Sequence, residues 1–113
     1  MIQIYHNSRC SKSRQCLTLI ENSGAQFEVI KYLEKPITVI ELNEIISKLK
    51  IDPIDLVRKK EKIWIEEFKN KALSPKEIIE IMAKNPILIE RPIVINKNKA
   101  VVARPVEKAL EII

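Results

Sequence analysis

The chain has 113 residues, of which only one is glycine and one is histidine, and it has no long apolar run. Its apolar stretches are far shorter than the roughly 20 residues that a membrane-spanning helix needs. The amino terminus leads directly into a predicted strand, without the pattern of a signal peptide. This length suits one hydrophobic core. We therefore expect a single cytoplasmic domain over residues 1–113, with no membrane segment.

Aromatic residues are also scarce, which argues against nucleic-acid binding. The five present are scattered and form no platform for stacking bases: Tyr5, Phe27, Tyr32, Trp64 and Phe68. The formal net charge is +5, but lysines alternate with glutamates along amphipathic helices instead of forming a block. We interpret this pattern as a solvated surface. An anionic substrate remains compatible with the charge.

Only two cysteines occur, Cys10 and Cys16, which fits free thiols in a reducing compartment. Cys10 lies where a strand breaks into a polar loop and a helix begins, so unpaired N–H groups and the helix dipole favour its thiolate. Basic side chains nearby add positive charge: His6, Arg9, Lys12 and Arg14. The alternative is a small packed side chain, but its neighbours are polar. The sequence therefore predicts a nucleophilic cysteine.

The first third of the chain has a strand, helix, strand pattern. Residues 2–5 predict a short strand, residues 11–23 predict an amphipathic helix, and residues 27–32 predict a second strand. Gly24 falls where the end of a helix favours a left-handed residue, so we interpret it as a cap.

The middle of the chain, at about residues 38–85, is predicted to be a helical insertion. Thr38 with Glu41 forms a capping box, and Ser74 with Glu77 forms another. Asp52 and Pro53 have the pattern of an N-cap and a first helical residue.

The last third is predicted to be a hairpin followed by a helix. Residues 92–95 and 100–103 are apolar runs, and asparagines in the connection suit a left-handed turn position. A helix is expected to begin at Pro105, with four residues facing inward: Val106, Ala109, Leu110 and Ile113. The whole pattern predicts a small α/β sandwich with a helical insertion.

Two arginines precede prolines at the boundaries of predicted elements. Arg104 stands just before Pro105, so its charge opposes the dipole of the expected helix, which makes sense if an anion binds there. Arg91 precedes Pro92 in the same way, and Arg58 is less distinctive. All three could also be ordinary surface residues.

Four motifs follow one another from the first strand to the last helix: Tyr5-His6-Asn7-x-x-Cys10-x-x-Ser13-Arg14, Leu56-Val57-Arg58-Lys59, Asn85 to Val94 with Glu90-Arg91-Pro92, and Ala103-Arg104-Pro105. In this order they resemble the glutaredoxin-coupled arsenate reductases, in the short branch of the ArsC-like proteins that are related to the Spx-type regulators. The resemblance implies a thioredoxin-like fold: β-α-β, helical insertion, β-hairpin and C-terminal helix.

The resemblance also implies roles for site residues. Cys10 would attack arsenate, with three thiol-activating residues beside it: His6, Ser13 and Arg14. The oxyanion would be bound by three arginines: Arg58, Arg91 and Arg104. Guanidinium groups suit this task because a thiolate repels an oxyanion unless charge is offset. His6 could instead be a strand-end residue with a local hydrogen bond.

The resemblance further implies that glutathione is a co-substrate, that glutaredoxin resolves the mixed species, and that arsenite is released. No bound cofactor or metal is required, and a monomer is expected. Ser13 stands where a thioredoxin-type dithiol enzyme has its second cysteine. Cys16 lies roughly one and two-thirds helical turns after Cys10, so we expect a core thiol.

Ser8 departs from the family pattern, in which proline usually stands at this position, and it predicts a looser loop. The Arg91-Pro92 bond, often cis in this fold, is left open by the sequence. Two other functions also stay open. One is an Spx-like module that binds RNA polymerase, against which Ser13 argues. The other is a glutathione-dependent thiol reductase or transferase with another substrate.

Overall fold

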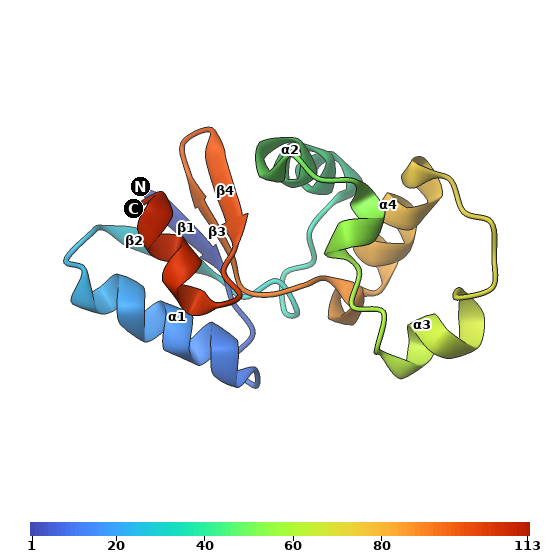
Figure 1. The fold of residues 1–113 in the computed structure, drawn as a ribbon, viewed down its shortest axis with the longest axis horizontal. Coiled ribbons are helices and arrows are strands. Elements are labelled where there is room, and N and C mark those ends of the chain that lie inside the picture. The colour runs from blue at the N-terminus through green and yellow to red at the C-terminus, as the bar shows by residue number, and fades with distance from the viewer. The chain divides into compact units, whose positions relative to one another are not determined.

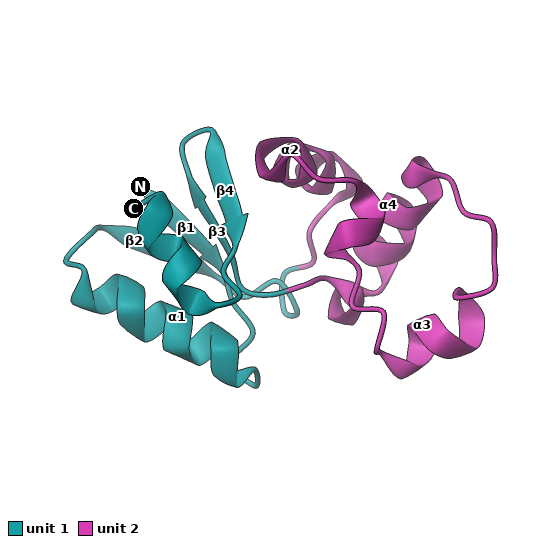
Figure 2. Cartoon of the chain, in the orientation of Figure 1, with its two compact units in different colours: residues 1–35, 91–113 teal, residues 36–90 magenta.

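A computed structural model describes all residues, 1–113, and divides the chain into two compact units. The first unit consists of residues 1–35 and 91–113, and the second of residues 36–90 (Figure 2). The second unit is therefore inserted into the chain of the first. None of the helices has the length and apolar character to cross a membrane.

The first unit is built on a four-stranded sheet with the order β2-β1-β3-β4 (Figure 1). Its strands are β1 (Ile2–Tyr5), β2 (Phe27–Ile30), β3 (Ile93–Asn96) and β4 (Lys99–Val102). β1 runs parallel to β2 and antiparallel to β3, and β3 and β4 form an antiparallel hairpin. Because a parallel pair needs a crossover, the helix after β1 is required by this topology.

One face of this sheet is covered by α1 (Ser11–Asn22) and by the 3₁₀ helix η3 (Val106–Glu111). The core between them consists of side chains from the sheet, α1 and η3: Ile2, Ile4, Cys16, Ile20, Val94, Ala103, Val106 and Ala109. The β-α-β unit, the hairpin and the final helical segment make this the thioredoxin-like α/β fold that the sequence predicted.

The second unit is helical, as predicted for the insertion. It contains α2 (Val39–Leu49), η1 (Pro53–Leu56), α3 (Lys62–Glu67), α4 (Pro75–Lys84) and η2 (Pro86–Leu88). Within this unit, α4 packs against α2, η1 and η2. Both predicted capping boxes are present, at the starts of α2 and α4.

Three boundaries differ from the prediction. β2 ends at Ile30, and Tyr32 is buried in the turn that follows, where the backbone N–H of Glu34 donates to the Lys31 carbonyl. Asp52 makes no side-chain cap, and Pro53 opens only the single 3₁₀ turn η1. Pro105 precedes η3 instead of starting an α-helix. A proline signals where a helical turn begins but not how long it continues.

The prediction of which residues of the last helix face inward was also partly wrong. Leu110 is 55% exposed, whereas Val106 and Ala109 are buried as predicted. The reason is the change of helix type, because a 3₁₀ helix has three residues per turn and an α-helix has 3.6. The face that packs on the sheet therefore repeats every three residues, from Val106 to Ala109.

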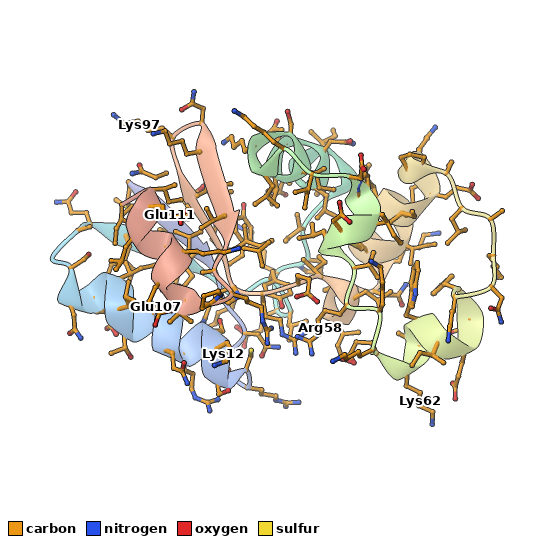
Figure 3. The ribbon with its side chains drawn as sticks, viewed as in Figure 1. Lys12, Arg58, Lys62, Lys97, Glu107 and Glu111 are labelled. Atoms are coloured by element: carbon orange, nitrogen blue, oxygen red, sulfur yellow. The ribbon has the colours of Figure 1, made fainter.

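The hairpin turn uses a different left-handed residue from the one expected. Lys97, with φ of 59°, takes the left-handed conformation in place of an asparagine, and it lies at the tip of the hairpin (Figure 3). Gly24 has φ of 77° just after α1, which confirms its predicted role at the helix end.

The capping box of α4 gives a first prediction. Ser74→Ala removes the hydroxyl that accepts a hydrogen bond from the Glu77 N–H, so it should lower the free energy of unfolding by about 1 kcal/mol. Urea unfolding followed by circular dichroism measures the change. Ser47→Ala, an exposed position within α2, is the control and should be nearly neutral. Equal effects of the two substitutions would contradict the role of the cap.

Candidate active site

Cys10 is the N-cap residue of α1. Its backbone is extended, with φ of −92° and ψ of 121°, and its carbonyl accepts the first helical hydrogen bond, from the N–H of Arg14, at 3.0 Å. The Cys10 N–H donates to the Asn7 carbonyl at 3.0 Å, which closes the loop tightly before the helix. The thiol is partly exposed and unpaired with another cysteine. This is the helix-start position that the sequence predicted.

Several groups act on the ionisation of Cys10. Partial burial is the largest single influence and opposes the thiolate. It is outweighed by hydrogen bonds to the sulfur from the Ser13 N–H, the Arg91 guanidinium and the Lys12 N–H, together with the charge of Arg91, so the pKa of Cys10 is lowered. Lys12 thus contributes through its backbone, and its side chain is exposed on the first turn of α1 (Figure 3).

Ser13 connects the loop to the end of β1. Its side chain is fully buried, and its Oγ accepts a hydrogen bond from the Asn7 N–H at 3.0 Å. The same oxygen lies 2.6 Å from Nδ1 of His6. A hydroxyl has one proton to donate, and here it can be directed to Nδ1 of a neutral ring. In this tautomer the proton of the imidazole is on Nε2, and in the other tautomer Nδ1–H donates to the Ser13 oxygen.

His6 is only 5% exposed, and its environment favours the neutral ring. Burial is the main reason that the pKa of His6 lies below its ordinary value of 6.5, and the charges of Lys31 and Arg14 lower it further, against a smaller opposing effect of Ser13. At neutral pH, His6 therefore carries no charge. This argues against the expectation that His6 adds positive charge beside Cys10, because burial moves its pKa further below neutral pH than that of an exposed imidazole.

Asn7 is a structural residue of the loop that sequence reasoning quoted but gave no role. It is buried, its Oδ1 accepts from the Arg9 N–H at 3.0 Å, and its carbonyl accepts from the Cys10 N–H. The bond from a side-chain oxygen to the N–H two residues later is an Asx turn. An asparagine at the end of a strand, three residues before a cysteine, is the signal that could have indicated it.

Arg14 stabilises the loop from the other side. Its Nη1 donates to the Ser8 carbonyl at 2.9 Å, so the loop is tied at the residue where the sequence predicted looseness. Arg14 is exposed, and it is absent from the groups that set the pKa of Cys10. Of the three residues expected to activate the thiol, only Ser13 acts on the sulfur directly.

Arg91 and Arg104 meet in the first unit. Nη1 of Arg104 donates to the Arg91 carbonyl at 3.1 Å, and the peptide bonds that follow both arginines, to Pro92 and Pro105, are cis. Arg91 is only 9% exposed and donates to the sulfur of Cys10. Sequence reasoning gave Arg91 only an anion-binding role and missed this direct contact with the thiol.

Arg58 belongs to the second unit, just after η1 (Figure 3). Its Nε lies 3.6 Å from a carboxylate oxygen of Glu61, and its backbone N–H donates to the Leu88 carbonyl at 2.7 Å. The side chain is thus held by a partly exposed ion pair within its own unit.

Cys16 differs from Cys10 in every respect that matters for reactivity. It is fully buried in the core, as predicted, and burial raises its pKa to about 11. A thiol that stays protonated is a poor nucleophile. No group of three or more His, Cys, Asp or Glu side chains gathers in an arrangement that could hold a metal ion.

The arrangement is therefore a thiol of lowered pKa at a helix start, hydrogen-bonded to the Arg91 guanidinium, with the Arg104 guanidinium hydrogen-bonded to the Arg91 carbonyl. Guanidinium groups are permanently charged and their planar donors match oxyanions. The N–H groups of the first helical turn supply further donors for an anion. Such a site can attack a small oxyanion that a bare thiolate would repel.

Comparison with known proteins agrees with this geometry. The profile of the ArsC family matches residues 5–112. The chain belongs to the ArsC family. It is 44% identical to an arsenate reductase of Haemophilus influenzae, over 97% of each chain, and 40% identical to the uncharacterized protein YfgD of Escherichia coli, over 99% of this chain and 96% of that one.

A solved structure of an arsenate reductase from Vibrio cholerae has the same fold as this ArsC family member. Its TM-score is 0.94 at 41% identity, and the match covers 99% of this chain and 97% of that chain. The family resemblance stated from the four sequence motifs is thereby confirmed over the whole length.

The contact between Arg91 and Cys10 gives a prediction about this ArsC protein. Arg91→Met should raise the pKa of Cys10, because it removes a hydrogen bond and a positive charge from the thiolate. The pH dependence of thiolate absorbance measures the shift. The rate of alkylation by iodoacetamide at neutral pH should fall several-fold in the same variant.

Lys12→Met is the matched control. It removes the same charge but keeps the backbone N–H through which Lys12 acts, so the pKa of Cys10 should stay unchanged. If both substitutions raised the pKa equally, diffuse positive charge and not the Arg91 contact would be responsible. Cys16 should be alkylated only after unfolding.

A third prediction concerns His6, which is the only histidine of the chain and therefore gives a resolved signal in NMR spectra. Its pKa in the folded protein should lie below 6.5, with the proton on Nε2. As pH falls below 6.5, the unfolded chain binds this proton first, so stability should decrease by at most about 1.4 kcal/mol per pH unit. His6→Gln should flatten that slope. A folded pKa above 6.5 would contradict the neutral ring.

Proposed function

We propose that this protein is an arsenate reductase that uses Cys10 as its nucleophile. The observation that supports this most directly is the hydrogen bond between the Arg91 guanidinium and the Cys10 sulfur, at a thiol whose pKa is lowered. The names of relatives at 44% and 41% identity support the choice of arsenate among oxyanions.

In the proposed first step, the Cys10 thiolate attacks the arsenic atom of arsenate. A sulfur–arsenic bond forms, and one oxygen leaves with protons as water. Arg91 and Arg104 offset the negative charge of the oxyanion, and the N–H groups at the start of α1 bind another oxygen. Arg58 is proposed as a further anion ligand from the second unit. His6, Ser13 and Arg14 hold the loop in place.

In the proposed second step, glutathione attacks the arsenic and displaces another oxygen as water. A glutaredoxin thiol then attacks the sulfur of the bound glutathione. The disulfide between glutaredoxin and glutathione forms, and the electron pair of the broken sulfur–arsenic bond reduces As(V) to As(III). Water then attacks the As(III) atom and breaks its remaining bond to the Cys10 sulfur, so arsenite leaves with the added oxygen and Cys10 returns as a thiolate. The protein would act as a monomer in the cytoplasm, where glutathione is reduced.

The first experiment measures arsenite formed from arsenate with glutathione and glutaredoxin present. Cys10→Ser should reduce turnover by roughly a hundredfold or more, because the nucleophile is lost. Cys16→Ala should retain most activity, because Cys16 is buried and stays protonated. Circular dichroism checks that both variants fold.

Each other outcome of this experiment contradicts a defined part of the proposal. Loss of activity in folded Cys16→Ala would make Cys16 a resolving thiol. Activity without glutathione would exclude it as co-substrate. An inactive wild type that reduces a small disulfide instead would show that arsenate is not the substrate.

A further inference from the structure

A polar pocket of about 320 Å³ opens beside the Cys10 loop. None of the residues that lower the pKa of Cys10 lines this pocket. Its lining residues all lie in the first unit: His6, Asn7, Ser8, Arg9, Lys31, Leu33 and Glu34. They come from the segments that follow β1 and β2. Since these strands are parallel, both segments leave the same edge of the sheet, which is where ligands bind in open α/β folds.

The pocket has an unused hydrogen-bond donor in its wall. Only 5% of His6 is exposed, and its Nδ1 is hydrogen-bonded to the Ser13 hydroxyl. In the tautomer whose Nδ1 accepts from Ser13, Nε2 carries the proton and makes no hydrogen bond within the protein. Nε2 is not fully buried, so a ligand in the pocket can reach it. The lining of the pocket by His6 makes a bound ligand the natural acceptor.

The charges around the pocket are of both signs. Arg9 and Lys31 are positive, and the charge of Lys31 is close enough to act on His6. Glu34 is negative, and it follows Lys31 in a turn closed by the bond from its N–H to the Lys31 carbonyl, at 3.0 Å. A tetrahedral oxyanion would be repelled by Glu34. A ligand with carboxylates and an ammonium group would be matched by this arrangement.

We infer that this pocket binds the thiol co-substrate of the proposed reaction, a small zwitterionic peptide thiol. Its carboxylates would meet Lys31, Arg9 and Nε2 of His6, and its ammonium group would meet Glu34. The volume lies at the small end of the range for ligand pockets, about 300–1,000 Å³. Asn7 to Arg9 form both the pocket wall and the loop of Cys10, so a thiol bound here is next to the nucleophile. This inference rests on the proposed function.

The test measures binding without chemistry. S-methylglutathione, which has no free thiol, is titrated into Cys10→Ser and followed by calorimetry. In that background, Lys31→Met and Glu34→Gln should each weaken binding by about fivefold, as expected for an exposed ion pair of about 1 kcal/mol. Lys35→Met is the matched control, since Lys35 is exposed, carries the same charge and lies outside the pocket. It should leave the affinity unchanged.

The kinetic arm uses the protein with its own Cys10. Lys31→Met and Glu34→Gln should raise KM for glutathione severalfold and leave KM for arsenate unchanged. Normal KM for glutathione in both active variants would overturn the pocket and leave the proposed function standing. If arsenate is not reduced at all, the binding arm still decides whether the pocket takes a peptide thiol.

Three results of the binding arm would overturn the inference. One is no saturable binding of S-methylglutathione at millimolar concentrations. Another is an equal loss of affinity in Lys35→Met, which would indicate general charge. The last is that inorganic phosphate displaces S-methylglutathione while Glu34→Gln leaves its affinity unchanged. That result would make the pocket a simple anion site.

Discussion

The buried hydroxyl of Ser13 is the interaction on which the geometry around Cys10 depends. One oxygen atom accepts from the Asn7 N–H and lies against Nδ1 of His6, so it ties the helix start to the end of β1. Asn7 in turn accepts the Cys10 N–H. Replacing a single buried partner in such a network leaves others unsatisfied, which costs more than the bond itself. Ser13 thereby positions both the nucleophile and the neutral imidazole.

Local signals in the sequence predicted much of the fold. The capping boxes at Thr38 and Ser74 were found because they are complete within four residues. The helix start at Cys10 followed from a change of composition. Features set by distant contacts were not predictable: the length of the turn after Pro53, the exposed side of η3 at Leu110, and the left-handed Lys97. In each case, tertiary packing decided between conformations that the local sequence allows.

The candidate site likewise combines features that the local sequence predicts with features that depend on distant contacts. Residue types and the family resemblance indicated Cys10, Ser13 and Arg91, but not how they act. The neutral state of His6 depends on burial, and the effect of Arg91 on the thiol depends on a chain segment about eighty residues away meeting the loop. Neither the burial of His6 nor the contact between Arg91 and the loop can be predicted from the spacing of residues in the sequence. The Asx turn of Asn7 is local and could have been predicted.

The insertion of the second unit between Lys35 and Arg91 has a consequence for how the family can diversify. Every group that sets the pKa of Cys10 lies in the first unit. Changes within residues 36–90 therefore leave the means of forming the thiolate intact. Substitutions in that inserted stretch, Arg58 included, can therefore accumulate in the family without changing how readily the Cys10 sulfur ionises.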